Sequence, residues 1–118
     1  MPDNTILDLT RLEEAFEDDT AGIVELLHMA LETGAKHLRT LEDGLAAGDA
    51  NAVARAAHGI KGSAGNVGAL HVASFAAELD QRARTGDLSG ARERIDAIAN
   101  AYEALAREID AYRASVSK

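Results

Sequence analysis

The sequence of 118 residues contains no cysteine and no tryptophan, and its only proline is Pro2. Without cysteine the chain has no disulfide, no thiolate nucleophile and no cysteine-ligated metal, which is typical of a reducing compartment. Because proline interrupts helices, its absence after residue 2 leaves every later helix unbroken. Aromatic residues make up only 3% of a chain that is 47% hydrophobic. This composition predicts a helical protein whose core is packed from alanine and aliphatic side chains.

Positive charge is also scarce, since 12 Lys and Arg residues stand against 20 Asp and Glu residues and the net charge is −8. Proteins that bind nucleic acid cluster Lys and Arg on their surface, so we expect no nucleic-acid partner. No window approaches the roughly 18 apolar residues of a membrane-spanning helix. The N-terminus also lacks the regions of a signal peptide. We therefore expect a cytoplasmic protein with no membrane contact, and the initiating Met1 and polar C-terminus favour a free-standing one.

Apolar residues recur at alternating spacings of three and four along most of the chain, which predicts amphipathic helices. The expected helices cover about 10–17, from Thr20 to near Gly48, about 50–66, about 69–84 and about 88–115. We expect residues 1–7 to be flexible. Four long helices joined by links of two to five residues must pack as antiparallel neighbours. The sequence thus predicts one all-α domain over 1–118, an antiparallel up-down-up-down four-helix bundle with a short extra N-terminal helix across one end.

Polar residues and glycines mark the expected helix ends. Thr10 and Glu13 have the spacing of a capping box, which predicts Thr10 as the N-cap of the first helix. The run 18–20, Asp-Asp-Thr, is typical of a loop followed by an N-cap. Gly48-Asp49 and Gly86-Asp87 each combine a helix stop with a cap for the next helix. These signals predict that the last helix begins directly after Asp87.

Residues 57–69 read AHGIKGSAGNVGA and carry the clearest functional signal. On a helix of about 100° per residue, His58 lies about 140° from the centre of the apolar stripe and faces water. Lys61 and Gly62 follow one turn later and Gly65 two turns later. A helical glycine costs about 1 kcal/mol relative to alanine, so Gly62, Gly65 and neighbouring Gly59 need a reason. They either clear space around His58 for another molecule or let two helices cross closely.

This stretch resembles the motif of histidine-containing phosphotransfer (HPt) domains, Ala-His-x-Leu-Lys-Gly-Ser followed by a Gly-Ala pair. The residues that match it directly are Ala57, His58, Lys61, Gly62, Ser63, Gly68 and Ala69, and Ile60 stands in place of the leucine. The resemblance extends over nearly the whole chain, because the expected helices fit the family's layout. One departure is Met29-Ala30, where the family often has an aromatic residue; we interpret it as a core packed with smaller side chains.

The resemblance implies a phosphorelay intermediate. His58 would accept a phosphoryl group on its outer nitrogen, Nε2, from a receiver-domain phospho-aspartate and pass it to another receiver aspartate. Lys61 would offset the phosphoryl charge, and a docking surface for the receiver would comprise Gly62, Gly65, Arg55 and Ala54. The implied partners are response-regulator receiver domains and a hybrid histidine kinase. We expect a monomeric phosphocarrier without kinase activity, metal or cofactor of its own, with Mg²⁺ bound by the receiver.

Other interpretations stay open. A helical bundle could dock on a kinase or receiver and inhibit it without being phosphorylated. A histidine kinase fragment is disfavoured, because the chain has no nucleotide-binding motif. His28 and His37 lie nine residues apart, about 180° around one helix, so they cannot share a metal. Glu25-x-x-His28 lacks the second copy that a di-iron bundle needs, and His71 either approaches the surface of His58 or contacts solvent.

Overall fold

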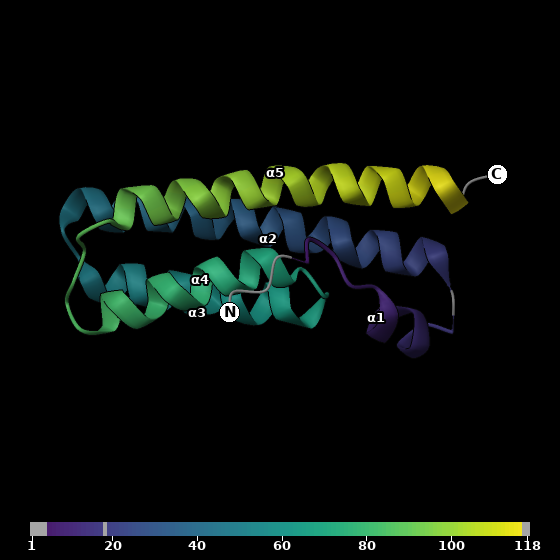
Figure 1. Cartoon of the computed structure of the whole chain (residues 1–118), viewed down its shortest axis with the longest axis horizontal. Helices are drawn as coiled ribbons and strands as arrows, with labels where there is room; N and C mark the ends of the chain where they lie inside the picture. Colours follow the sequence, from purple (N-terminus) through teal and green to yellow (C-terminus); the bar gives the residue numbers. More distant parts are fainter. Residues whose placement is uncertain (1–4, 18, 117–118) are drawn as a thin grey trace.

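The computed structural model describes residues 5–17 and 19–116, and this part of the chain contains helices and no strand. The five helices of Figure 1 are α1 (Thr10–Ala15), α2 (Thr20–Ala47), α3 (Ala50–Asn66), α4 (Leu70–Arg84) and α5 (Ala91–Val116). The all-α prediction is therefore confirmed. Among the described residues, no helix combines the length and the apolar character needed to cross a membrane.

The four long helices form a ring in which α2 and α4 each contact both α3 and α5. Residues 48–49 and 67–69 link the first three of them, so these neighbours run antiparallel, as predicted; the last link, 85–90, is one residue longer than the predicted range. Because α3 and α4 have 17 and 15 residues, they cover only part of the 28-residue α2 and the 26-residue α5. Helix α1 lies beside the start of α2, at the end of the bundle that α3 and α4 leave uncovered (Figure 1).

The ends of α2 and the start of α3 follow the predicted signals. The Asp19 carboxylate accepts a hydrogen bond from the N–H of Gly22 at 3.3 Å and caps α2. Gly48 ends α2 with a left-handed φ of 66°, which a residue without Cβ adopts at no cost. Asp49 then caps α3 by accepting from the N–H of Ala52 at 3.1 Å. Residue 18, part of the predicted loop, lies outside the described residues.

Two predicted caps are wrong. The N-cap of α1 is Leu9, which has no capping side chain, and the Asp8 carboxylate instead accepts from the N–H of Thr10 at 3.0 Å. Asp87 does not cap a helix beginning at residue 88. It accepts from the N–H of Ser89 at 2.9 Å, and this local turn delays α5 to Ala91. Asp side chains that bond nearby backbone compete with helix formation in this way.

Residues 5–7 are not the flexible lead that the sequence predicts for residues 1–7. The Thr5 carbonyl accepts from the N–H of His71 at 2.8 Å, and the N–H of Asp8 donates to the Gly68 carbonyl at 2.8 Å. Ile6 and Leu7 are half-buried against the core. Apolar side chains and backbone bonds thus hold this segment on the α3–α4 link, and residues 1–4 lie outside the described part.

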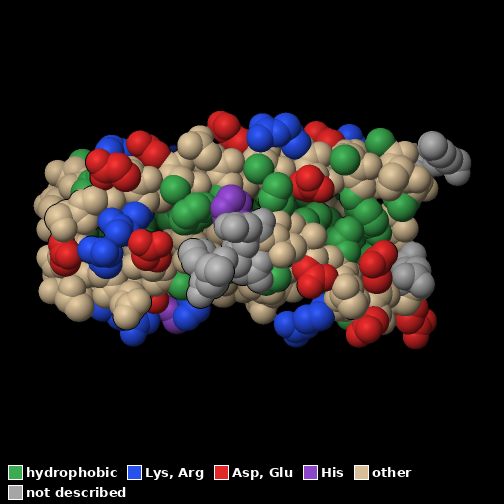
Figure 2. All heavy atoms as spheres, in the orientation of Figure 1, with side chains coloured by type: hydrophobic (Ala, Val, Ile, Leu, Met, Phe, Trp, Pro, Cys, Tyr) green, Lys and Arg blue, Asp and Glu red, His purple; other side chains and the backbone are tan. Residues whose placement is uncertain are grey.

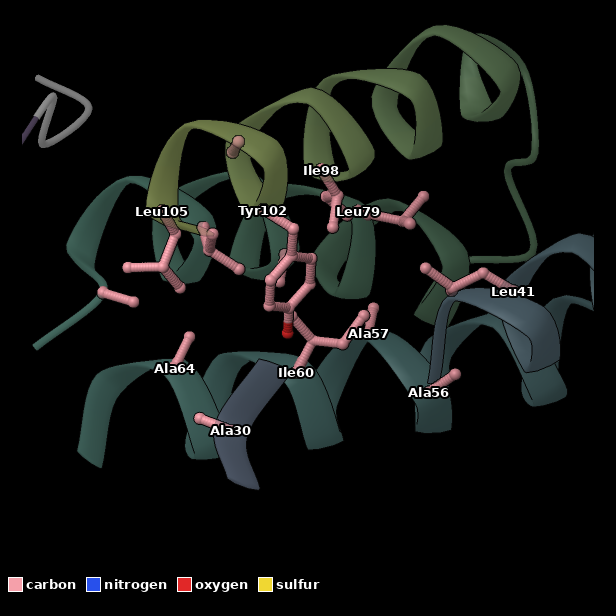
Figure 3. Close-up of a cluster of buried hydrophobic side chains, with 14 of the residues drawn as sticks. Ala30, Leu41, Ala56, Ala57, Ile60, Ala64, Leu79, Ile98, Tyr102 and Leu105 are labelled. Atoms are coloured by element: carbon pink, nitrogen blue, oxygen red, sulfur yellow. The ribbon is translucent and has the colours of Figure 1, made fainter. Parts of the chain in front are cut away.

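The core is built from alanine and aliphatic side chains, as the composition predicts. Tyr102 is the buried aromatic residue at its centre, and its ring extends from α5 towards Ile60 on α3 (Figure 3). Gly34 on α2 makes room for this ring, because a Cβ there would overlap it. Ala30 is 7% exposed and belongs to the core, whereas Met29 is 56% exposed. The core of smaller side chains expected at Met29-Ala30 thus holds for Ala30, while Met29 lies at the surface.

Candidate functional site

His58 lies near the middle of α3 and its side chain is 62% exposed, as the helical periodicity predicts. The inward side of α3 is anchored by Ala57 and Ile60, which are fully buried. Burial of these side chains fixes the rotation of α3 about its axis. The backbone therefore presents the imidazole to solvent on the side that borders α4.

The imidazole Nδ1 faces two charged residues of α4. It lies 3.3 Å from Oδ2 of Asp80 and 3.4 Å from Nη2 of Arg84. Arg84 also donates two hydrogen bonds to Asp80, from Nε to Oδ1 at 2.8 Å and from Nη2 to Oδ2 at 3.2 Å. Asp80 is only 5% exposed, although its two partners are largely in solvent. A buried carboxylate thus lies between an exposed imidazole and an exposed guanidinium.

The charges in this trio determine which imidazole nitrogen carries the proton. The Asp80 carboxylate can only accept hydrogen bonds and the Arg84 guanidinium can only donate them. If Nδ1 carries the proton, it donates to Asp80, and both Arg84 donors remain on the carboxylate. If Nδ1 lacks the proton, it can accept only from Nη2 of Arg84 at 3.4 Å, and its lone pair then faces the Asp80 carboxylate at 3.3 Å, which is repulsive. We therefore assign the proton to Nδ1, which leaves Nε2 with its lone pair and no hydrogen bond to any described residue.

Asp80 stays ionised despite its burial. Burial alone raises the pKa of this carboxyl, but hydrogen bonds from Arg84 and His58, together with their positive charge, outweigh that effect. The net result is a pKa below the ordinary value of 3.8. In return, the carboxylate raises the pKa of the Arg84 guanidinium. Asp80 therefore presents a full negative charge to Nδ1 at neutral pH.

The glycines of α3 divide into two kinds. A Cβ added to Gly62 or Gly65 would meet nothing within 4 Å, so both stand on an open face. This observation contradicts a close helix crossing at these two positions. A Cβ on Gly59 would instead lie 2.6 Å from the imidazole of His37 on α2. Gly59 thus makes room for a neighbouring helix, and the idea that it clears space for another molecule is wrong.

A hollow of about 450 Å³ extends from His58 towards the start of α3. Its lining residues come from α3 and α4 and are Asn51, Ala54, Arg55, His58, Asp80 and Arg84. Arg55 is exposed, whereas Ala54 is 8% exposed and contributes little surface. Lys61 is exposed one turn after His58, and it forms no ion pair with a described residue. Two of the predicted docking residues therefore border the hollow, while Lys61 and the open glycines lie beyond His58.

The other histidines stand apart from this arrangement. His71 lies nine residues before Asp80, about 180° around α4, and its ring is 4.7 Å from that of Phe75. Of the two alternatives for His71, approach to the surface of His58 is thus wrong; its Nδ1 is buried without a hydrogen bond to any described residue. His37 packs over Gly59. Within residues 5–17 and 19–116, no three His, Cys, Asp or Glu side chains are grouped as metal ligands.

Comparison with known proteins identifies the family. A model of the Hpt domain matches residues 25–108. The chain belongs to the Hpt domain family. A similar solved structure is the crystal structure of histidine-containing phosphotransfer protein B (HptB) from Pseudomonas aeruginosa PAO1, with 30% sequence identity and a TM-score of 0.85. The similarity covers 96% of this chain and 98% of that one. The comparison with curated proteins gave no match.

Membership of the Hpt family makes the chain a phosphocarrier of phosphorelays. Domains of this family relay phosphoryl groups in systems of histidine kinases and receiver domains. The resemblance drawn from residues 57–69 is thereby confirmed. Sequence reasoning missed Asp80 and Arg84, which come from a different helix of this Hpt domain. A signal was present, because Asp80 follows buried Leu79 at the border of an apolar stripe and is paired with an arginine four residues later.

Proposed function

We propose that His58 is the phosphoacceptor of this Hpt domain. It accepts a phosphoryl group from a phospho-aspartate of a response-regulator receiver domain and passes it on to the aspartate of another receiver. The observation that carries this proposal is the exposed imidazole with Nδ1 turned to buried Asp80 and Nε2 free. A protein that only docks on a partner has no use for such an oriented nucleophile.

The chemistry of the transfer follows from this orientation. The Nε2 lone pair attacks phosphorus, the bond between phosphorus and the aspartyl oxygen breaks, and the receiver aspartate leaves as a carboxylate. The ring gains positive charge in this step, while Nδ1 keeps its proton. The Asp80 carboxylate, 3.3 Å from Nδ1, stabilises that charge. The reverse sequence delivers the group to the next receiver, so no proton has to be exchanged with solvent.

The residues around His58 suit a receiver that approaches the open face of α3. Gly62 and Gly65 leave this face clear, and Lys61 places a cation one turn from the imidazole. Beside the glycines, Ser63 and Asn66 of α3 and Met29 of α2 border a second hollow of about 280 Å³. Among the described residues, the exposed large apolar side chains are Met29 and Val116, and Met29 is the more exposed of the two. We include it in the receiver-docking face, with Arg55 and Ala54 on the other side of His58.

The decisive experiment supplies the protein with a receiver that carries a labelled phosphoryl group. Wild-type protein acquires label that is lost in acid and stable in base, as expected of phosphohistidine. His58→Gln acquires none and keeps its helicity and melting temperature, because an exposed side chain contributes little to stability. His37→Gln is the matched control and still acquires label. Label in His58→Gln would overturn the assignment.

Two further arms separate a carrier from a kinase and from a docking protein. With labelled ATP and no receiver, the protein stays unlabelled; self-labelling would contradict the absence of kinase activity. Lys61→Ala slows transfer about tenfold without abolishing it, a smaller loss than removal of a buried oxyanion donor causes. A protein that binds the phosphorylated receiver tightly but never acquires label would be an inhibitor of the relay.

A further inference from the structure

Two hollows lie along α3, one before and one after His58, and they differ in charge. The hollow of about 280 Å³ that includes Met29 is lined by seven residues, none of which is charged. The hollow of about 450 Å³ towards the start of α3 is lined by two arginines, Arg55 and Arg84, and by one carboxylate, Asp80. Apolar contact is not directional, whereas charges discriminate between partners. The two hollows therefore suit different tasks when a partner docks.

Arg55 carries the charge of this second hollow that no described residue neutralises. Asp80 accepts two hydrogen bonds from Arg84, so the charges of these two residues offset each other. Arg55 is exposed and has neither an ion pair nor a hydrogen bond with any described side chain. It also borders a hollow of about 250 Å³ towards α2, which leaves open space on both of its flanks. One positive charge is thus available to an anionic group of a partner.

The surroundings of Arg55 favour a carboxylate side chain over the phosphoryl group that is transferred. The hollow extends from the Nδ1 side of the imidazole, which borders Asp80. The proposed phosphoryl site, Nε2, is on the other side of the ring. The amide of Asn51, about one turn before Arg55, lines the same hollow. An amide N–H and a guanidinium both donate to a carboxylate, and the bonds from the guanidinium are charge-assisted.

We propose that Arg55 is a specificity-determining residue, which selects receiver domains that bring an aspartate or glutamate side chain into the hollow before His58. This inference rests on the proposed function, because the partner is the receiver that exchanges the phosphoryl group with His58. The uncharged hollow beside Met29 supplies contact that any receiver with an apolar face can use. Arg55 discriminates among these receivers, because a lysine or arginine at the facing position is repelled.

The first test measures transfer from a phosphorylated receiver to Arg55→Glu, Arg55→Lys and Arg107→Glu. We expect Arg55→Glu to raise KM about tenfold, since one exposed attraction is lost and one repulsion is added. Its kcat should not fall, because Arg55 bonds neither to the imidazole nor to Asp80. Arg55→Lys keeps the charge and should raise KM far less. Arg107→Glu changes the net charge equally on α5, diagonally opposite α3, and is the matched control.

The same measurement can overturn the inference. An unchanged KM in Arg55→Glu, or an equal rise of KM in Arg107→Glu, would show that Arg55 does not select the receiver. A loss of kcat together with a lower melting temperature would show that Arg55 supports the structure of α3 instead.

A charge-reversal scan of the receiver then tests the acidic side chain. Each exposed aspartate and glutamate of the receiver is changed to lysine in turn. One of these receiver variants should transfer poorly to wild type and recover about tenfold with Arg55→Glu, because the two facing charges are again opposite. If no receiver variant recovers with Arg55→Glu, the proposed carboxylate partner is refuted.

Binding of the unphosphorylated receiver separates this inference from the phosphorylation of His58. In His58→Gln, which lacks the imidazole, Arg55→Glu should still weaken receiver binding about tenfold by calorimetry. If wild type binds the receiver without ever acquiring label and Arg55→Glu weakens that binding, the role of Arg55 stands and the phosphorylation of His58 is refuted. Label on His58 with receiver binding that does not depend on Arg55 refutes the role of Arg55 alone.

Discussion

Asp80 is a charged residue that is only 5% exposed. Buried charges are tolerated only when they are paired, and Asp80 is paired on both sides. Its pairing links the helix that carries His58 to the helix that supports it. The same residue therefore contributes to stability and to the orientation of the His58 imidazole.

This double role predicts a distinctive response to acid in Asp80→Asn. Because the folded pKa of Asp80 is lowered, the stability that it contributes is present above the ordinary carboxyl pKa and is lost as the pH falls below it. We expect Asp80→Asn to be less stable than wild type by about 1–2 kcal/mol at neutral pH. The difference should shrink below about pH 4, where wild type loses this contribution. Urea unfolding at several pH values measures it; a constant difference would contradict the assignment.

A second residue-scale prediction concerns Tyr102, whose hydroxyl is buried without a hydrogen bond to any described residue. Burial raises the pKa of this phenol to about 12. Since an unsatisfied buried hydroxyl costs about 1–3 kcal/mol, Tyr102→Phe should stabilise the protein by about 1 kcal/mol in urea unfolding. Gly34→Ala should instead destabilise it, because the added Cβ overlaps the Tyr102 ring. A less stable Tyr102→Phe would show that the hydroxyl has a partner such as water.

Sequence reasoning failed at the residue scale where a contact joins two helices. The periodicity of residues 53–67 placed His58 outward, which depends only on helix geometry. The pairing of His58 with Asp80 spans 22 positions in the sequence, and it depends on how α3 and α4 are rotated against each other. The same limit applies to Gly59, whose neighbour His37 comes from α2. Tertiary packing, which local spacing does not encode, decided these roles.

At the scale of helices, the glycines of the motif predict opposite effects on stability and function. Gly62 stands in open space within α3, so Gly62→Leu should raise or preserve stability, by up to about 1 kcal/mol, and yet impair transfer by blocking the receiver. Gly68 ends the motif with a φ of 80°, against the backbone of Asp8. Gly68→Ala should therefore destabilise the protein. Thermal unfolding and transfer rates, measured for both variants, test these predictions. Strong destabilisation by Gly62→Leu would instead indicate that Gly62 lets two helices cross closely.

The presence of each helix was predictable, whereas the caps of α1 and α5 were not. The periodic apolar residues of α2 to α5 identify each long helix, because an amphipathic face has to be buried. The capping residue is harder to predict, because an aspartate side chain can accept a hydrogen bond either from the first turn of the helix or from its own local turn. Asp49 does the former and caps α3, whereas Asp87 does the latter and delays α5 to Ala91.

At the scale of the whole molecule, charge is distributed unevenly around the site. The chain carries a net charge of −8, and on the face drawn in Figure 2 acidic and basic side chains are interspersed. The hollow beside His58, by contrast, is lined by Arg55, Arg84 and one carboxylate, Asp80, and Lys61 is exposed one turn from His58. The molecule is 48 Å long, whereas salt screens charges beyond about 8–10 Å at physiological ionic strength. An approaching receiver is therefore influenced by the local cations more than by the total charge.

This distribution predicts the sign of the salt effect on transfer. If the total charge of −8 governed the encounter with an anionic phospho-aspartate site, added salt would screen repulsion and speed transfer. Because the local cations dominate, raising the salt concentration from about 0.1 M to 0.5 M should slow transfer several-fold, mainly through KM. Lys61→Glu should weaken this dependence. Arg107→Glu, on helix α5, which lies diagonally opposite α3 in the ring of helices, changes the net charge equally and should leave it intact. Equal effects of the two substitutions would show that total charge, and not the cations beside His58, guides the receiver.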